Sequence, residues 1–151
     1  RACVQSLVQF TSLTSLNLSG VEAIGDVEVA DIAKRLQHLR TLTLDWLETI
    51  TSSAVEGLTV AKGLHNLFMA GCQGLGSSVS LNLAKFSSLT AIGLQDTSID
   101  DSSLSIIASS DFLPSTLQRF HLESCQITDD GVAQLVIFSS LNTITLVGCE
   151  K

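Results

Sequence analysis

The stretch LQRFHLESCQITDDGVAQL, from Leu117 to Leu135, decides the fold. Leu117 opens it, and Phe120 and Leu122 lie two residues apart, so that their side chains point to the same side of a short strand. Cys125 and an acidic turn follow, and the turn leads into a short amphipathic helical pattern. One such unit cannot bury its apolar side alone, so it requires neighbouring copies of itself.

The same unit begins six times along the chain, at intervals of 26, 25, 25, 28 and 24 residues. The starts are Leu13, Leu39, Leu64, Leu89, Leu117 and Leu141. Repetition at a near-constant period predicts stacked units, with parallel strands on one side and helices on the other. The strands are expected near 15–18, 41–44, 66–69, 91–94, 119–122 and 143–146. The wider helical side should make the stack curve.

Within each unit the ninth residue is predicted to point into the core. These residues are Val21, Leu47, Cys72, Thr97, Cys125 and Cys149. Helices should follow at side chains that can accept the free N–H groups of a first helical turn, and then bury residues at helical spacing, including Val132 and Val136 in the fifth unit. The candidate capping residues are Asp26, Ser52 or Ser53, Ser77 or Ser78, Asp100 or Asp101, and Asp129 or Asp130. The fourth unit carries an insertion in which Pro114 must leave the helix.

These units resemble the cysteine-containing class of the leucine-rich repeat family, whose pattern resembles LxxLxLxxCxxITDxGLxxLA. Cys72, Cys125 and Cys149 match its Cys position, and ITDDGVAQL at 127–135 and SIDDSSLSIIA at 98–108 match its later half. Val21, Leu47 and Thr97 depart from it. The resemblance runs from Leu13 to Cys149 and implies an α/β solenoid. Such a solenoid is a curved right-handed αβ horseshoe, with a parallel sheet on the concave face and helices on the convex face.

We expect residues 1–151 to form a single leucine-rich repeat domain, in which residues 1–12 are the remnant helix of a preceding repeat. The chain lacks an initiator Met, and no polar segment closes either end of the array, although solenoids need one for solubility. The sequence therefore indicates a fragment of a longer chain. Self-association through the open ends is the alternative.

Composition favours a protein partner over nucleic acid or a membrane. The net charge of −7 and the pI of about 4.7 repel phosphate groups. The longest uncharged run, Gly63 to Ala84, holds too many polar groups to cross a bilayer, despite a mean hydropathy of +0.40. The first residues lack a signal-peptide layout, and cysteines at core positions indicate a reducing compartment, so we expect a cytoplasmic location.

No residue set in the sequence predicts catalysis, a cofactor site or a metal site. His38, His65 and His121 lack the close Cys/His spacing that zinc requires, and the cysteines are expected to be buried. The segment Gly71 to Ser78 lacks the lysine of a phosphate loop, and the adjacent Asp pairs fit helix starts. The chain is therefore predicted not to be an enzyme.

Binding is instead predicted on the outward positions of the strands and the residues just after them. The expected partner-binding residues are Thr43, Asp45, Trp46, Asn66, Phe68, Gln95, Asp96, Arg119, His121 and Glu123. Trp46 and Phe68 would form an aromatic centre, since aromatic side chains are frequent hot spots. In the alternative interpretation, Trp46 folds over the rim of the sheet and Phe68 covers Ala70 and Gly93.

The expected function is a protein-interaction module that binds its partner on the concave strand face. The resemblance to leucine-rich repeat proteins implies two further alternatives. Similar repeats occur beside an F-box as substrate-recognition arms of ubiquitin ligases, and others occur in extracellular or receptor-type recognition domains.

Overall fold

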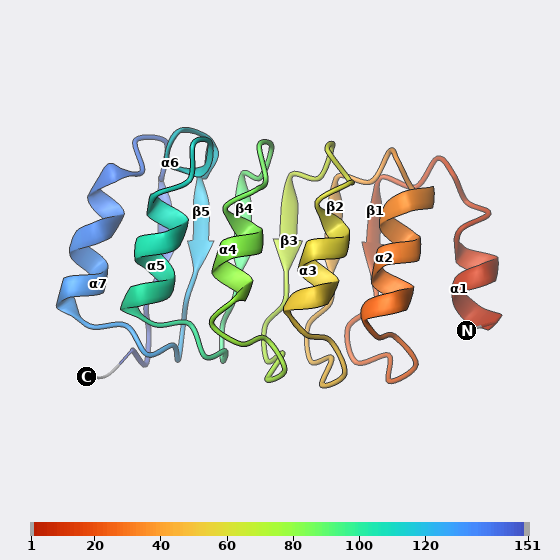
Figure 1. Cartoon of the computed structure of the whole chain (residues 1–151), viewed down its shortest axis with the longest axis horizontal. Coiled ribbons are helices and arrows are strands. Elements are labelled where there is room, and N and C mark those ends of the chain that lie inside the picture. Colours follow the sequence, from red (N-terminus) through yellow and green to blue (C-terminus); the bar gives the residue numbers. More distant parts are fainter. Residues whose placement is uncertain (1, 150–151) are drawn as a thin grey trace.

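The computed structural model describes residues 2–149, in which short strands and helices alternate along the chain (Figure 1). Within these residues six strands pair side by side, in parallel and in sequence order. They are β1 (Ser15–Asn17), β2 (Thr41–Thr43), β3 (Asn66–Phe68), β4 (Ala91–Gly93), β5 (Arg119–His121) and β6 (Thr143–Thr145). Each predicted strand is confirmed and is one residue shorter than expected.

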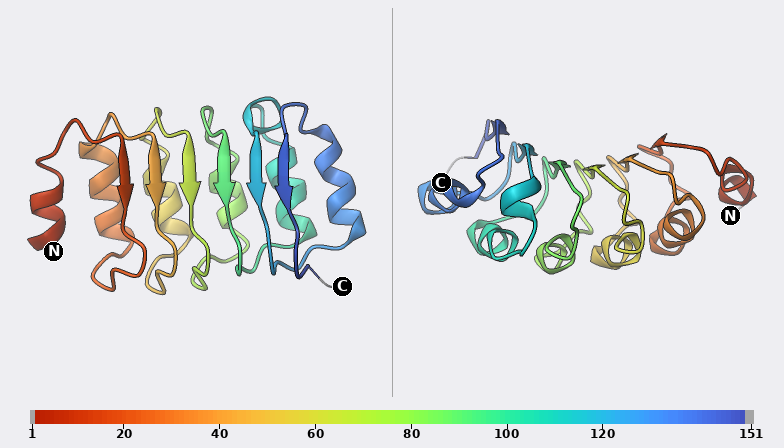
Figure 2. Two further views of the ribbon diagram at one scale, coloured as in Figure 1. Left: turned by 180° about the vertical axis from the view of Figure 1, so that it is seen from behind. Right: turned by 90° about the horizontal axis from the view of Figure 1, so that it is seen from above.

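The helices lie on one side of the sheet and leave its other face open, and the ends of the strand row turn toward the open side (Figure 2). The open face is therefore concave, as expected for a horseshoe segment. The helices are α1 (Ala2–Leu7), α2 (Asp26–Arg35), α3 (Ser52–Leu58), α4 (Val79–Leu83), α5 (Asp101–Ala108), α6 (Leu113–Thr116) and α7 (Asp129–Gln134), and the 3₁₀ turn η1 (Leu135–Ile137) continues α7.

The core lies between the sheet and the helices, and the leucine at each repeat start contributes to it. The middle residue of β2, β3, β4 and β5 is fully buried, as is Leu94 in the longest unit. Register is also as predicted, since Ala91 pairs with Arg119 across the insertion. Val132 and Val136 differ from expectation, because they are 39% and 86% exposed. They lie at the last helix of the described stack, where no further helix covers them.

Three helices begin where expected, but the residues that cap them differ from those expected. Gly25 precedes α2, whereas Thr51 and Thr128 cap α3 and α7 by accepting hydrogen bonds from the N–H groups of Ser53 and Asp130, both at 3.2 Å. Ser78 and Asp100 hold the cap positions of α4 and α5, as predicted. Both the carboxylate and the neighbouring threonine hydroxyl can accept such bonds. The sequence alone therefore does not show which of the two side chains caps the helix.

Two aspartates that were expected to cap helices lie at helix starts, as predicted, but their carboxylates bind the next repeat. The Asp26 carboxylate accepts hydrogen bonds from the N–H and hydroxyl of Thr51, at 2.8 and 2.7 Å. Asp101 accepts the same two bonds from Thr128, at 3.0 and 2.6 Å. Each carboxylate therefore fixes the threonine that caps the following helix, and the repeats are linked on the edge where their helices begin.

The cysteines of the repeat pattern form a second link between units. Cys72 and Cys125 donate from Sγ to the carbonyl oxygens of Leu44 and Leu94 in the preceding strand segments, at 3.1 and 3.2 Å. Burial raises the pKa of both thiols, which keeps them protonated and able to donate. Cys149 makes the equivalent bond, and all three are free thiols. The expected inward orientation of these cysteines is confirmed.

The insertion of the fourth unit forms an element that the sequence did not predict. α5 ends at Ala108, and Pro114 lies in the first turn of the separate short helix α6. Pro is accepted there because the first-turn N–H groups have no partner within a helix. Among the described residues, no helix combines the length and apolar composition needed to span a bilayer.

Candidate partner-binding face

The predicted binding residues lie along the open side of the sheet. Thr43, Asn66, Phe68, Arg119 and His121 belong to the strands, whereas Asp45, Trp46, Gln95, Asp96 and Glu123 follow the carboxyl ends of the strands. Trp46, Asp96 and Arg119 are exposed, and the other residues are partly buried. Three groups of contacts divide them.

Arg119 forms the centre of the first group. Its Nη2 donates to Oδ1 of Asn66 at 3.2 Å, and the register places the small Ala91 between the two residues. Asn66 Nδ2 in turn donates to Thr41 Oγ1 at 2.8 Å. A polar chain therefore crosses the strands from β5 to β2, and it holds the guanidinium group against the face of the sheet.

Phe68 and His121 form the second group. A Cβ at Gly93 would lie 2.7 Å from Phe68 Cδ1, so the phenyl ring covers this glycine. The rings of Phe68 and His121 are tilted by 44°, with centroids 6.4 Å apart, and His121 Nδ1 lies 3.0 Å from Thr145 Oγ1. Phe68 therefore follows the alternative interpretation in covering Gly93, and one edge of its ring system is fixed by a histidine.

Asp45, Gln95 and Glu123 occupy equivalent positions in three repeats, two residues after the end of a strand, but their side chains make different contacts. Asp45 Oδ1 accepts a hydrogen bond from the N–H of Ala70 at 2.8 Å, so this carboxylate links two repeats. Gln95 Oε1 and Glu123 Oε2 are buried and receive no hydrogen bond from the described residues. A buried acceptor without a donor costs about 1–3 kcal/mol.

Trp46 occupies a backbone position that the sequence did not reveal. Its φ is +59°, in the left-handed region that side chains with a Cβ rarely adopt. The equivalent residue of every described repeat has a φ between +53° and +75°. These residues are Gly20, Gly71, Asp96, Ser124 and Gly148. The three glycines at these equivalent positions are the sequence signal for this conformation, because glycine adopts a positive φ without strain.

The indole of Trp46 lies between two of these glycines. On the side of the third repeat a Cβ at Gly71 would collide with the six-membered ring, so the ring covers this glycine. On the side of the first repeat Trp46 borders a hollow of about 470 Å³. Gly20, Glu22, Leu47, Glu48 and Thr49 complete its lining. The side chain nevertheless remains 60% exposed. Trp46 and Phe68 therefore lean on different glycines and form no shared aromatic centre among the described ring contacts.

Charge differs between the two edges of the open face. Arg40, His65 and Arg119 lie where strands begin, whereas His121 lies at the carboxyl end of β5. Carboxylates follow the strand ends, at Glu22, Asp45, Glu48, Asp96 and Glu123. Because all strands are parallel, the two arginines gather at one edge and the carboxylates at the other. Electrostatic complementarity would therefore fix the direction in which a partner lies across the strands.

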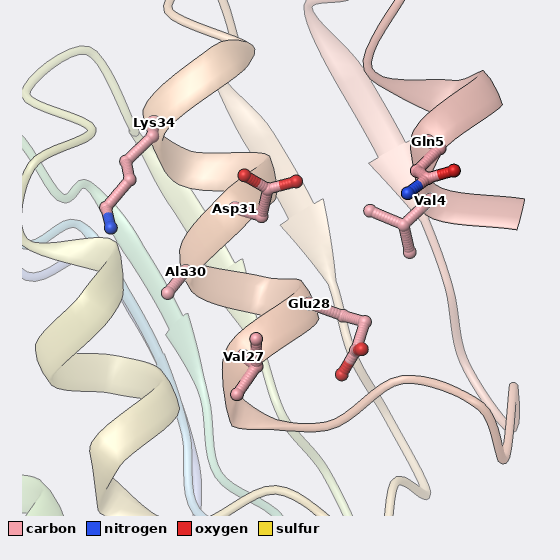
Figure 3. Close-up of a pocket in the computed structure, with 7 residues that line it drawn as sticks. All are labelled: Val4, Gln5, Val27, Glu28, Ala30, Asp31 and Lys34. Carbon is pink, nitrogen blue, oxygen red and sulfur yellow. The ribbon is translucent and has the colours of Figure 1, made fainter. Parts of the chain in front are cut away.

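A second hollow, of about 600 Å³, lies between α1 and α2 on the helical side (Figure 3). Its lining includes Val4 and Gln5 of α1 and Asp31 and Lys34 of α2, but none of the predicted binding residues. Within residues 2–149, no cluster of three or more His, Cys, Asp or Glu side chains could hold a metal ion.

Comparisons with known proteins agree with this architecture. A family model described as "Leucine Rich repeat" matches residues 114–136. The BTB/POZ domain-containing protein FBL11 of Arabidopsis thaliana is 25% identical over 155 residues, in a match that covers 93% of this chain. The chain spans only 16% of that relative's length. The tropomodulin C-terminal domain of Caenorhabditis elegans matches with a TM-score of 0.67 and 12% identity, over 92% of this chain and 90% of that domain.

Stacked strand and helix units with one parallel sheet define an α/β solenoid of the leucine-rich repeat type. The chain has the fold of a leucine-rich repeat solenoid, and residues 114–136 match the leucine-rich repeat model directly. Repeats of this kind generally mediate contacts between proteins, and folds of this type are typically interaction modules without catalytic activity.

Proposed function

We propose that this chain is a non-enzymatic module that binds another protein on its concave strand face. The open sheet carries the proposal, because helices cover its opposite side and no described element covers the outward side chains of the strands. Parallel strands bring equivalent side chains to a spacing of about 4.8 Å. The predicted residues from Thr43 to Glu123 therefore form one continuous surface.

The side chains on this surface suit a protein more than a nucleic acid or an anionic membrane. Arg119 and Trp46 are exposed and are of the types enriched at protein interfaces. The net charge of −7 repels phosphate groups. We also place this activity in the cytoplasm, because the buried core cysteines remain free thiols.

A capture experiment with matched variants tests the proposal. The immobilised chain is exposed to cell extract, and the dissociation constant of each captured protein is then measured with purified components. The double variant Arg119→Ala/His121→Ala should weaken binding at least tenfold, since charged and aromatic contacts at an interface centre dominate affinity. The control Lys34→Ala/Glu56→Ala changes exposed residues on the helical side and should bind normally. Equal loss in both variants, or in neither, would exclude the concave face.

The same measurement tests Trp46 separately. Trp46→Ala should cost on the order of 2 kcal/mol of binding if this side chain anchors the partner. An unchanged affinity would remove Trp46 from the interface while leaving the rest of the face in place.

A finer candidate is the substrate-recognition arm of a ubiquitin ligase. The relative in Arabidopsis thaliana is described as containing a BTB/POZ domain, and it matches this chain over only 16% of its length. Repeats like these can therefore occur in a longer protein that has another domain. If the captured protein is a ligase substrate, its ubiquitination in cells should require the concave residues Arg119 and His121. Ubiquitination that is unaffected by their replacement would reject this candidate.

Self-association and an extracellular recognition role stay as alternatives. Sedimentation of the purified chain over a range of concentrations measures the first. A concentration-dependent dimer that the concave variant Arg119→Ala/His121→Ala leaves intact would point to pairing elsewhere, such as at the repeat ends. The extracellular alternative would require function in an oxidising environment, which the free thiols Cys72 and Cys125 do not favour.

A further inference from the structure

We propose that the hollow beside Trp46 binds one arginine side chain of the partner protein. This inference rests on the proposed function, because it states the chemistry of the partner at one end of the concave face. Three features of the hollow carry it: an aromatic wall, an empty floor and two carboxylates.

The aromatic wall is the indole of Trp46. Its six-membered ring lies against the backbone of Gly71, where a Cβ would collide with it, so the ring is supported from the side of the third repeat. Trp46 also lines the hollow on the side of the first repeat, and the residue is 60% exposed. A cation within about 6 Å of a tryptophan ring is attracted by its π electrons, and the planar guanidinium group can also stack on it.

The floor of the hollow is Gly20, which occupies the equivalent position one repeat earlier. A Cβ added there would meet nothing within 4 Å, so the space above this residue is open. The hollow measures about 470 Å³, within the range of roughly 300–1,000 Å³ that is typical of ligand pockets. Among the six equivalent positions, only Trp46 is an aromatic residue, and it has glycine on both sides. Among these six positions, an aromatic side chain beside an open space above a glycine is therefore found only at Trp46.

The charge of the hollow selects a cation. Glu22 and Glu48 both line it, both are exposed, and neither has a hydrogen-bond or ion-pair partner among the described residues. No basic side chain lines the hollow. Because a guanidinium group presents N–H donors in a rigid fork, it can pair with a carboxylate while its plane faces the indole. An arginine therefore matches both the wall and the carboxylates.

The test uses the intrinsic fluorescence of the 151-residue chain, which contains a single tryptophan. The probe is the peptide acetyl-Gly-Arg-Gly-amide, and the matched control peptide carries citrulline, which has nearly the same shape and no charge. Titration with the arginine peptide should change the emission of Trp46 in a saturable, salt-sensitive manner. The citrulline peptide should bind at least about fivefold more weakly, because it loses both the ion pair and the cation–π attraction.

Two variants test the roles of the lining residues without removing the fluorescent reporter. Glu22→Gln/Glu48→Gln should weaken binding of the arginine peptide about fivefold or more. The matched control Glu56→Gln/Asp129→Asn removes two exposed carboxylates from helices and should leave it unchanged. Equal binding of the two peptides, equal binding by the two variants, or the absence of a saturable signal would overturn the inference.

The outcomes also separate this inference from the proposed function. If the arginine peptide fails to bind but capture of a partner still depends on Arg119 and His121, the concave face stands and the arginine site falls. If the peptide binds as expected but no partner depends on the concave residues, the hollow is a cation site and the proposed interaction surface falls.

Discussion

Trp46 adopts a backbone conformation that the fold requires, and it also contributes an exposed side chain to the proposed binding surface. Its left-handed backbone costs roughly 1–2 kcal/mol relative to a glycine, and the fold accepts Asp96 and Ser124 in the same conformation. The repeat requires this turn, so the conformation is set by the scaffold and the side chain is free to vary. That freedom is what permits an aromatic ring at the rim of one repeat.

Gly71 and Gly20 form a matched pair that separates backbone strain from packing. Both have a φ of +68°, but only a Cβ at Gly71 meets the Trp46 ring. Gly20→Ala should therefore lose about 1 kcal/mol of unfolding free energy through strain alone. Gly71→Ala should lose more and should also shift the emission of Trp46. Chemical denaturation and fluorescence measure both effects, and equal losses without an emission change would contradict the packing of the ring on Gly71.

Prediction from the sequence succeeded at this scale where strand alternation decides the outcome. Alternation placed Arg119, His121 and Phe68 on the outward face, because side chains two apart share a side of the sheet. It failed beyond the strand ends, where a positive φ redirects the chain. The contact between Trp46 and Gly71 depends on that φ, and the flanking glycines alone did not indicate which way the ring would turn.

The elements of this fold are short, and their termini depend on hydrogen bonds from particular side chains. Asp100 caps α5, and the hydroxyl of Ser103 lowers the pKa of the Asp100 carboxyl, assisted by the N–H of Ser103 and the hydroxyl of Ser102. The folded state therefore stabilises the ionised form of Asp100 more than the unfolded state does. The contribution of Asp100 to the unfolding free energy is complete above its ordinary pKa of 3.8. It is lost as the pH falls through the lower pKa that the carboxyl has in the folded chain.

The pH dependence of stability tests this cap. Between about pH 5 and pH 3, the unfolding free energy of the wild-type chain should fall more steeply than that of Asp100→Asn, since the amide can cap but cannot titrate. Urea denaturation at several pH values gives both curves. Parallel curves would show that Asp100 does not contribute to the acid sensitivity of the fold.

The link between α5 and α7 makes a different prediction. Asp101→Ala should lose about 1–3 kcal/mol of unfolding free energy, because the partly buried N–H and hydroxyl of Thr128 would lose their acceptor. Asp129→Ala changes an exposed carboxylate in the first turn of α7 and should stay within about 0.5 kcal/mol of the wild type. Similar values for the two variants would mean that Asp101 acts only as a charge near a helix start.

The same pair of residues explains why helix starts were harder to predict than strands. The motif ITDD offers both a threonine and carboxylates to the first turn of α7, and local sequence does not rank them. Their ranking follows from the neighbouring repeat, since Asp101 reaches across to fix Thr128. A contact between residues 27 positions apart cannot be seen in one unit alone.

At the scale of the whole molecule, stability should depend on the position of a repeat in the stack. Ile92 and Ile144 occupy the same place in β4 and β6, but Ile92 is fully buried and Ile144 is 38% exposed. Ile92→Ala should lose about 2–5 kcal/mol of unfolding free energy, as buried aliphatic residues do. Ile144→Ala should lose clearly less, because a partly exposed side chain gives up less burial. Equal losses would show that the last repeat is as well covered as the middle one.

The order of the strands and their register could be predicted from the sequence because the repeat unit begins six times and each copy supports the alignment of the others. Leu94, in the irregular fourth unit, could be placed only because the units on either side define its register. The helix of the fifth unit, α7, and the η1 turn after it lack a neighbouring helix on one side among the described residues, and there the expectation for Val132 and Val136 failed. Stacking, more than local pattern, decides which residues of a helix are buried.

The bonds between repeats also bear on how fast the chain can fold. Those made by Asp26, Cys72, Asp101 and Cys125 each join residues 25 to 31 positions apart, which is about one repeat. Closing such a loop carries an entropic cost that depends on its own length and not on the length of the array. Folding can therefore begin at any adjacent pair of repeats and extend one unit at a time. The separation in sequence between contacting residues does not grow as more repeats are joined.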